Sequence, residues 1–239
     1  MNFYFISSLF IVMAWTFSTH ANANINSFPL SPYQAEYSVE YYGLNAGKSV
    51  HTLNLTQNKT YQIESKTIPR FKWIPVHFNE RSQFTWENND IRPLFYNYDL
   101  KEARKHKKGT VEFNWAAKQI ENRTGQEPYT HPLTLGMQDK LTHALKMRLD
   151  LLSDTQKPLH YMVAEDDEVK PYRFNIITKE RIRTELGWLD TIKISHTSRS
   201  GKRLTFWLAE SFEYAPVKVE QAKKGSVFAR GEIISYQKL

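Results

Sequence analysis

The chain has 239 residues, of which 24% are charged and 41% hydrophobic, and its formal net charge at pH 7 is +7. Because it has no cysteine, disulfides, thiol chemistry and the cysteine-linked lipid anchor of bacterial lipoproteins are excluded. The length fits one all-β domain or two small domains, with ample residues for a core.

The first 23 residues have the pattern of an export signal. The apolar run Phe3–Phe17 is shorter than the roughly 20 residues of a transmembrane helix. The small residues of Ala21–Ala23 predict cleavage after Ala23 or Ala21. No Lys or Arg precedes the run, and an uncleaved membrane anchor is the alternative. We therefore expect residues 24–239 to form a β-rich periplasmic domain, not integral to the membrane and without a nucleic-acid partner.

After residue 32, apolar residues recur at every second position, which is typical of β-strands. In "FNERSQFTW" (Phe78–Trp86) this alternation puts Glu80 and Ser82 on the same face as Phe84 and Trp86. A buried unpaired carboxylate is costly, so Glu80 must be paired, protonated or hydrated. Three interpretations follow: a structural strut bonded to a Tyr hydroxyl, an Arg or a strand end; a polar anchor in an apolar ligand groove; or a general acid or base.

Two segments between the first strands differ from this rhythm. Pro69 and Pro75 bracket "RFKWI", which predicts an edge or a crossing loop with Trp73 as an exposed lip residue. The basic stretch Lys101–Gly109 lies between two alternating runs. It is interpreted as a solvated hairpin tip, with attraction to lipid phosphates or other envelope polyanions as the alternative.

The segment "LGMQDKLTHALKMRLDLL" carries apolar residues at three- and four-residue spacing. This spacing predicts an amphipathic helix over about residues 136–152. Asp139 lies near its N-terminal end, where a carboxylate suits a cap or the helix dipole. Leu141, Leu145 and Leu149 are expected to pack across a sheet face.

Alternating strands resume after this helix and continue to the end of the sequence. A mainly β fold follows, with a strongly curved antiparallel sheet, or open half barrel, wrapped around the amphipathic helix. A closed outer-membrane barrel is the rival architecture. It predicts aromatic girdles and an uninterrupted lipid-facing band, whereas here a helix interrupts the strand series.

The motif "TELGWLDTIKI", followed by "FWLAESFEYAPVKVE", together with "FNERSQF", "RPLFYNY", "VEFNW" and "QDKLTHALKMRL", resembles domain-of-unknown-function family 3108, a group of bacterial exported envelope proteins. The similarity covers roughly Tyr33 to Gln237. It implies a secreted β-rich domain without an assigned activity and carries over no catalytic residues. The architecture is also similar, more distantly, to half-barrel envelope proteins that hold lipids or lipoproteins.

The sequence contains no metal-ligand spacing, serine elbow or phosphate loop, so no cofactor, metal or catalytic residue is assigned. The leading hypothesis is a non-catalytic protein whose concave sheet face binds a lipid or other amphiphile, or an apolar segment of an envelope protein. The alternatives are a cell-wall or polysaccharide hydrolase that uses Glu80, and a scaffold or assembly factor that acts through its outer surface. The predicted ligand contacts are Glu80, Ser82, Phe84, Trp86, Trp73, Leu141 and Leu145.

Overall fold

The computed structural model describes residues 27–71, 77–102, 105–123, 129–165 and 168–239. The predicted export signal, residues 1–23, and the predicted lip residue Trp73 lie outside the described residues.

The described strands form one sheet of fifteen members. They are β1 (Tyr33–Tyr41), β2 (Leu44–Leu55), β3 (Tyr61–Pro69), β4 (His77–Glu87), β5 (Asp90–Glu102), β6 (Lys105–Asn114), β7 (Gln119–Asn122), β8 (Tyr129–Pro132), β9 (Gln138–Asp139), β10 (Leu159–Ala164), β11 (Val169–Thr184), β12 (Gly187–Thr197), β13 (Lys202–Ala209), β14 (Ala215–Lys223) and β15 (Ser226–Lys238). Their order across the sheet is β8-β7-β6-β5-β4-β3-β2-β1-β15-β14-β13-β12-β11-β10-β9. Neighbours are antiparallel except β9 and β10, which are parallel.

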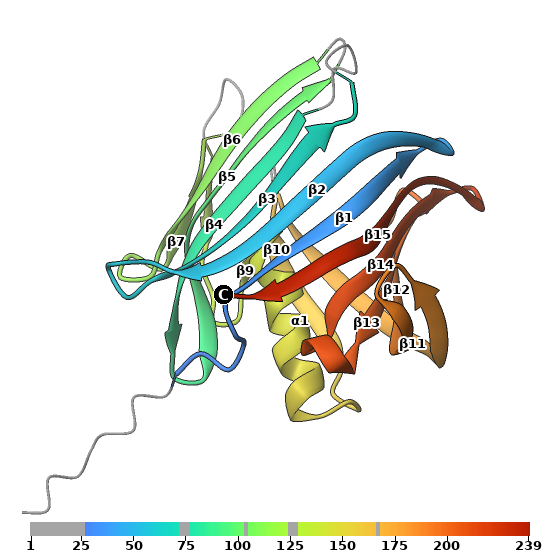
Figure 1. Ribbon diagram of the computed structural model, residues 1–239. Helices are drawn as coiled ribbons and strands as arrows, with labels where there is room; N and C mark the ends of the chain where they lie inside the picture. The colour runs from blue at the N-terminus through green and yellow to red at the C-terminus, as the bar shows by residue number, and fades with distance from the viewer. Residues whose placement is uncertain (1–26, 72–76, 103–104, 124–128, 166–167) are drawn as a thin grey trace, which may run out of the picture.

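The sheet curls around the helix α1 (Thr142–Ser153), and its outermost strands β8 and β9 do not pair with each other (Figure 1). The period-two pattern explains the strands, because in β4 the buried residues Ser82 and Phe84 alternate with the more exposed Arg81 and Gln83. The predicted fold class, a mainly β curved and unclosed sheet with a helix, is therefore confirmed.

The strands nearest the two ends of the sequence meet in the middle of the sheet. β1 pairs with β15 in antiparallel register, with Tyr33 opposite Lys238. Just beyond them, the Leu239 amide donates a hydrogen bond of 3.0 Å to the carbonyl of Pro32. β2 to β8 extend the sheet on one side of this pair, and β14 to β9 extend it on the other.

The helix begins at Thr142 rather than near Gly136, where the apolar spacing predicted its start. Gln138 and Asp139 instead form the short strand β9 beside β10. The cause is the Asp139 carboxylate, since its Oδ1 accepts hydrogen bonds of 2.8 Å from the amides of Leu141 and Thr142. This acceptor satisfies two amides at the start of the helix, those of the N-cap residue Leu141 and of the first helical residue Thr142, while Leu141 itself provides no side-chain cap.

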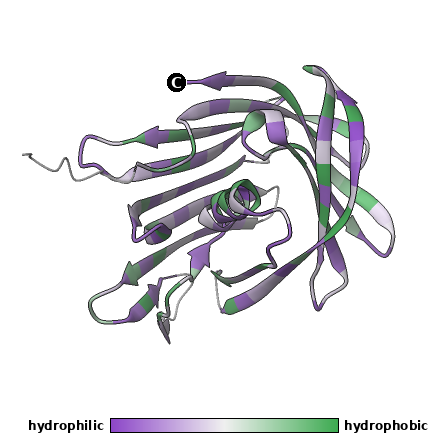
Figure 2. Cartoon of the chain, turned by 90° about the horizontal axis from the view of Figure 1, so that it is seen from below, coloured by the Kyte–Doolittle hydropathy of each residue, from purple (hydrophilic) through white to green (hydrophobic). Residues whose placement is uncertain are grey.

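The helix is buried on more than one face, in agreement with the prediction that the sheet wraps around it. Leu145 and Leu149 pack into a core cluster with Phe84 of β4. Met147 and Leu151 pack into a second cluster that includes residues of β12 and β13. Figure 2 shows the helix inside the curve of the sheet, where its polar residues Thr142, His143, Arg148 and Asp150 are buried together with its apolar ones.

Candidate functional site

Glu80 is half-buried on β4, opposite Tyr98 of β5 and Ser65 of β3. The hydroxyl of Tyr96 donates a hydrogen bond of 2.6 Å to Oε1 of Glu80. The carboxylate is thus held by a tyrosine from the neighbouring strand, which is the contact that the strut interpretation expects.

Ser82 links the sheet to the helix. Its hydroxyl donates a hydrogen bond of 2.6 Å to Oδ2 of Asp139, and both side chains are completely buried. Burial raises the pKa of Asp139, and the hydrogen bonds from Ser82 and from the amides of Thr142 and Leu141 oppose this rise. The polar face seen in the β4 sequence therefore serves in part to hold the capping residue of α1.

Four more of the predicted ligand contacts, all among the described residues, lie at the interface between helix and sheet. Phe84 and Leu145 are buried members of one core cluster, and Trp86 and Leu141 are partly buried against it. The Phe84 ring centroid lies 5.4 Å from that of Phe28. The structure thus gathers these residues around α1 and the adjacent core rather than along an open surface.

A buried histidine of α1 was not singled out by the sequence. The side chain of His143 is 5% exposed, and its Nδ1 lies 3.3 Å from the carbonyl oxygen of Asp139. Its ring packs on Tyr172 and Phe174, with centroid distances of 5.2 and 6.1 Å. Burial lowers the pKa of His143 to about 4, so the imidazole is neutral at pH 7. In the sequence, His143 follows Asp139 by four residues. This spacing was the available signal that the two residues lie close together.

A carboxylate next to this histidine is held by two donors. Glu165 accepts hydrogen bonds from the Tyr172 hydroxyl and, at 2.9 Å, from the Lys170 amine. Burial alone would raise the pKa of Glu165, but the hydrogen bonds from Tyr172 and Lys170 outweigh it and lower the pKa. Glu165 is therefore a carboxylate anchored in a local network.

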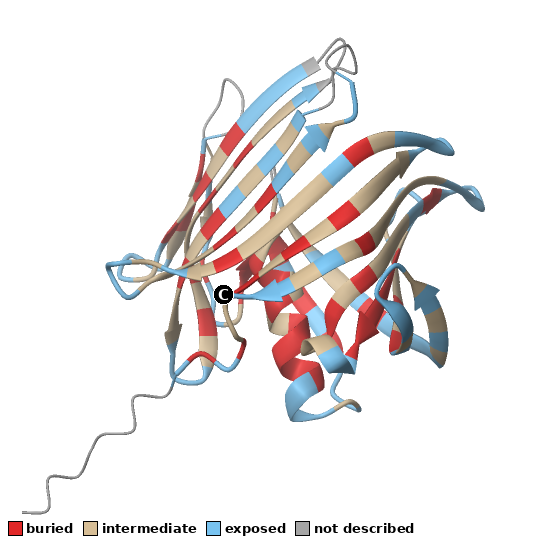
Figure 3. Ribbon diagram, in the orientation of Figure 1, coloured by how far each residue is buried: buried red, intermediate tan, exposed pale blue. Residues whose placement is uncertain are grey.

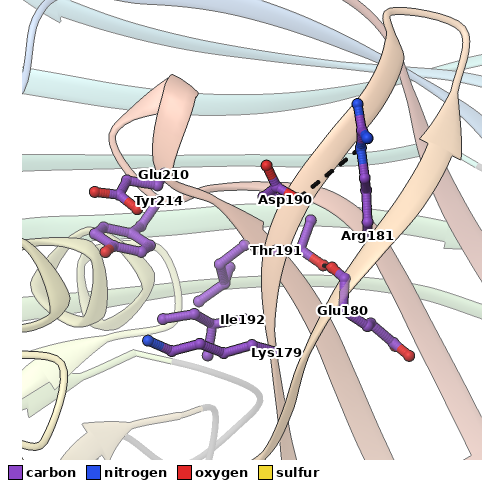
Figure 4. Close-up of a pocket in the computed structure, with 9 residues that line it drawn as sticks. Lys179, Glu180, Arg181, Asp190, Thr191, Ile192, Glu210 and Tyr214 are labelled. Carbon is purple, nitrogen blue, oxygen red and sulfur yellow. Dashed lines mark hydrogen bonds and ion pairs between the residues drawn. The ribbon is translucent and has the colours of Figure 1, made fainter.

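A pocket of about 210 Å³ opens between β11, β12, β13 and the 3-10 turn η1 (Glu210–Phe212), as Figure 4 shows. Its floor is formed by Ile192, Leu208 and Tyr214, which are buried in the cluster that packs on Met147 and Leu151 of the helix. The pocket therefore lies on the helix side of the sheet. Its charged lining residues are Lys179, Glu180, Arg181, Asp190 and Glu210.

The charges of this pocket are only loosely paired. Arg181 Nε lies 4.0 Å from Asp190 Oδ1, and both side chains are exposed, so solvent weakens their attraction. Within the described part of the chain, Lys179 and Glu210 form no ion pair. Glu180 differs, because its carboxylate accepts a hydrogen bond of 2.5 Å from Trp207 Nε1. The pocket thus combines an apolar floor with exposed charges of both signs.

Within the described ranges, no group of three or more His, Asp or Glu side chains is placed to hold a metal ion. The same residues include no helix with the length and hydrophobicity needed to cross a bilayer.

Comparisons with known proteins concern both the fold and the family of the chain. The chain is similar in fold to the crystal structure of a beta-barrel-like protein of domain of unknown function DUF1849 from Brucella abortus, with a TM-score of 0.54, 13% identity, and coverage of 88% of this chain and 98% of that one. It also aligns with the crystal structure of MucB at a TM-score of 0.35 and 7% identity, covering 87% of this chain and 53% of MucB. No curated protein matches the sequence. The family model described as protein of unknown function (DUF3108) matches residues 36–230, and the chain therefore belongs to the DUF3108 family.

Proposed function

We propose that this protein is exported to the periplasm and there binds an amphiphile, without catalysing a reaction, in the pocket between β11, β12, β13 and η1. The observation that carries the proposal is the composition of that pocket. Ile192, Leu208 and Tyr214 provide an apolar floor, and Lys179 and Arg181 provide exposed cations at its edge. Sites that bury a ligand typically combine such an apolar lining with a few polar groups that fix its orientation.

The size of the pocket limits what enters it. A volume of about 210 Å³ is below the roughly 300–1,000 Å³ of pockets that enclose drug-sized ligands. It suits the end of an acyl chain or another small apolar group, with the charged head group at the exposed edge beside Lys179 and Arg181. The phosphate of such a head group would lie beside the Lys179 amine, which has no ionic partner among the described side chains, and away from Glu210, which has none either.

The polar groups around the apolar floor of the pocket are consistent with a binding role. The Thr191 hydroxyl donates a hydrogen bond of 2.7 Å to the carbonyl of Glu180, so its proton is directed to the main chain. Glu180 itself is bonded to Trp207. Neither group has the arrangement of a nucleophile beside a base.

The amphiphile proposal is tested by native mass spectrometry and by calorimetric titration of the purified chain with lysophosphatidylglycerol. We expect the double variant Lys179→Glu/Arg181→Glu to bind this lipid about tenfold more weakly, since each reversal replaces an attraction to the head group by a repulsion. Lys59→Glu, an exposed reversal in the turn between β2 and β3, should bind as the wild type does. Wild-type protein that binds no lysophospholipid and purifies without a bound amphiphile would overturn the proposal.

Export is tested separately. Residues 1–23 have the apolar run and small-residue ending of a signal peptide. We expect the protein recovered from a periplasmic fraction to begin at Asn24, or at Asn22 after the alternative cleavage. An intact N-terminus on protein that fractionates with the membrane would instead support the uncleaved anchor.

A further inference from the structure

The hairpin ends at one end of the sheet form a continuous surface. In an antiparallel meander alternate turns lie at the same end, and here these include the turns after β1, β3, β5, β10, β12 and β14. We define the rim as the described residues 41–48, 68–71, 99–101, 106–108, 197–203 and 221–230. The register brings these ends side by side, since Tyr41 is opposite both Leu44 and Ala229, and Gly47 is opposite Pro69. In Figure 1 the labelled strands β1, β2, β14 and β15 turn at this end.

The rim exposes large apolar side chains. Tyr42 and Leu44 are 69% and 74% exposed, and Tyr41, Ile68, Phe71 and Val227 are also exposed. Figure 3 shows the ends of the β1–β2 and β14–β15 hairpins in the colour of exposed residues. Exposed apolar side chains that cluster rather than scatter singly mark an interaction surface.

The aromatic tip of β1 is held in a conformation that a tyrosine rarely adopts. Tyr42 has a φ of 50°, in the left-handed region that is costly for a bulky residue. Its amide donates a hydrogen bond of 2.8 Å to the carbonyl of Phe228, and its ring centroid lies 4.6 Å from that of Tyr41 and 6.2 Å from that of Phe228. The strained backbone of Tyr42 holds its ring in solvent, which indicates that this ring contacts a binding partner.

Basic residues surround these apolar groups. Many of them are exposed and form no ion pair with another described residue: Arg70, Lys101, Lys107, Arg199, Lys202, Arg203, Lys223 and Lys224. The carboxylates near the rim are already paired, Glu40 with Arg230 at 3.3 Å and Asp99 with His106 at 2.7 Å and Lys108 at 2.9 Å. The hairpin end between β10 and β11 lies at the same end of the sheet, beside that of β12 and β13, and is acidic; there Lys170 pairs with Glu165 at 2.9 Å and with Glu168 at 3.1 Å. The rim therefore carries uncompensated positive charge.

We propose that this rim docks on the surface of an anionic lipid bilayer. Tyrosine and aliphatic side chains at hairpin tips suit the interfacial region of a membrane, and unpaired Lys and Arg attract anionic head groups. The bases are on long flexible side chains at several separate tips, an arrangement that fits a fluid layer of anions better than one folded acidic partner. This inference concerns a surface apart from the pocket and does not depend on the proposed ligand.

The test is flotation of the full chain with vesicles of phosphatidylcholine alone and of phosphatidylcholine with phosphatidylglycerol. We expect binding to the anionic vesicles, weak binding to the neutral ones, and loss of binding at high salt, because salt screens the attraction. Lys223→Glu/Lys224→Glu should reduce binding about tenfold or more. The charge control Lys59→Glu and the apolar control Leu55→Ser, both in or beside the turn at the opposite end of β2, should bind normally.

A second variant separates membrane contact from stability. Tyr42→Asn removes the ring, yet Asn adopts the left-handed conformation more readily and precedes Gly43 as in a favoured tight turn. We expect it to fold at least as stably and to bind anionic vesicles more weakly. Equal binding by the wild type and both rim variants, or wild-type protein that floats with neither vesicle, would overturn the proposal. The pocket variant Lys179→Glu/Arg181→Glu should still float, which distinguishes failure of this inference from failure of the proposed function.

Discussion

Asn122 donates a hydrogen bond of 2.6 Å from its side-chain amide to the main-chain carbonyl of Glu165. Asn122 ends β7, near one edge of the sheet, and Glu165 follows β10, near the other edge. The hydroxyl of Tyr129 donates to the same carbonyl at 3.1 Å. At this end of the molecule, side chains join two edges that no strand pairing connects.

Replacing Asn122 by Ala is expected to lower the free energy of unfolding by about 1–3 kcal/mol, because it leaves the half-buried carbonyl of Glu165 with a single donor and opens a small cavity at the buried Asn122 position. Urea denaturation followed by circular dichroism measures this difference. Asn58→Ala in the exposed turn between β2 and β3 is the control and should change stability little. An Asn122→Ala protein as stable as the control would show that the junction contributes nothing to the fold.

The hydrogen bond between Ser82 and Asp139 should show strong energetic coupling. Both groups are buried, and the same carboxylate caps the helix. We expect Ser82→Ala and Asp139→Asn each to destabilise the protein by about 1–3 kcal/mol, and the double variant to lose less than the sum. A double-mutant cycle from denaturation curves measures the coupling. Strictly additive losses would mean that the two side chains act independently.

Because His143 is buried, we expect the free energy of unfolding to depend on pH within a defined pH range. The pKa of the His143 imidazole is about 4 in the folded protein, and the ordinary value of 6.5 applies to the unfolded chain. Between pH 6.5 and about 4 only the unfolded chain gains this proton, so stability falls as the pH is lowered, by about 3 kcal/mol in total. Well above pH 6.5 the imidazole is neutral in both states and contributes no slope.

His143→Phe should remove that slope while filling the same aromatic environment of Tyr172 and Phe174. The measurement is the difference in unfolding free energy between wild type and variant at several pH values, in which the contributions of Glu165 and other groups largely cancel. A difference that stays constant from pH 7 to pH 4 would exclude titration of His143 as the cause.

Arg148 joins the helix to the turn η1 through a buried guanidinium. The side chain is 1% exposed, Nε donates a hydrogen bond of 2.9 Å to the carbonyl of Glu213, and Nη2 donates one of 3.3 Å to that of Phe212. Arg148→Met is expected to destabilise the protein by about 3 kcal/mol, since it leaves both carbonyls without this donor. Thermal and urea unfolding provide the measurement, and Arg181→Met, on an exposed side chain, is the matched control.

The sequence predicted the fold class well, because each strand follows a local period that burial enforces. In β4, Ser82 and Phe84 are buried on the face that alternation assigned to them. The helix start was predicted less well. The apolar spacing begins at Met137, but the Asp139 carboxylate captures the amides of Leu141 and Thr142 and delays the first helical turn.

The pocket and the junction could not be predicted from local pattern. Lys179 and Glu210 come from elements separated by β12 and β13, and their proximity depends on strand register. Asn122 looked like an ordinary polar residue in a strand with little apolar character. Its burial arises because Glu165, from a distant hairpin, lies against it.

The pairing of β1 with β15 has a consequence for biosynthesis. During synthesis, the backbone groups along one edge of β1 have no hydrogen-bond partners until residues 226–238 have been made. Such non-local pairing delays completion of the sheet. Proteolytic loss of β15 would in turn uncover the edges of both β1 and β14 and leave templates for aggregation between copies.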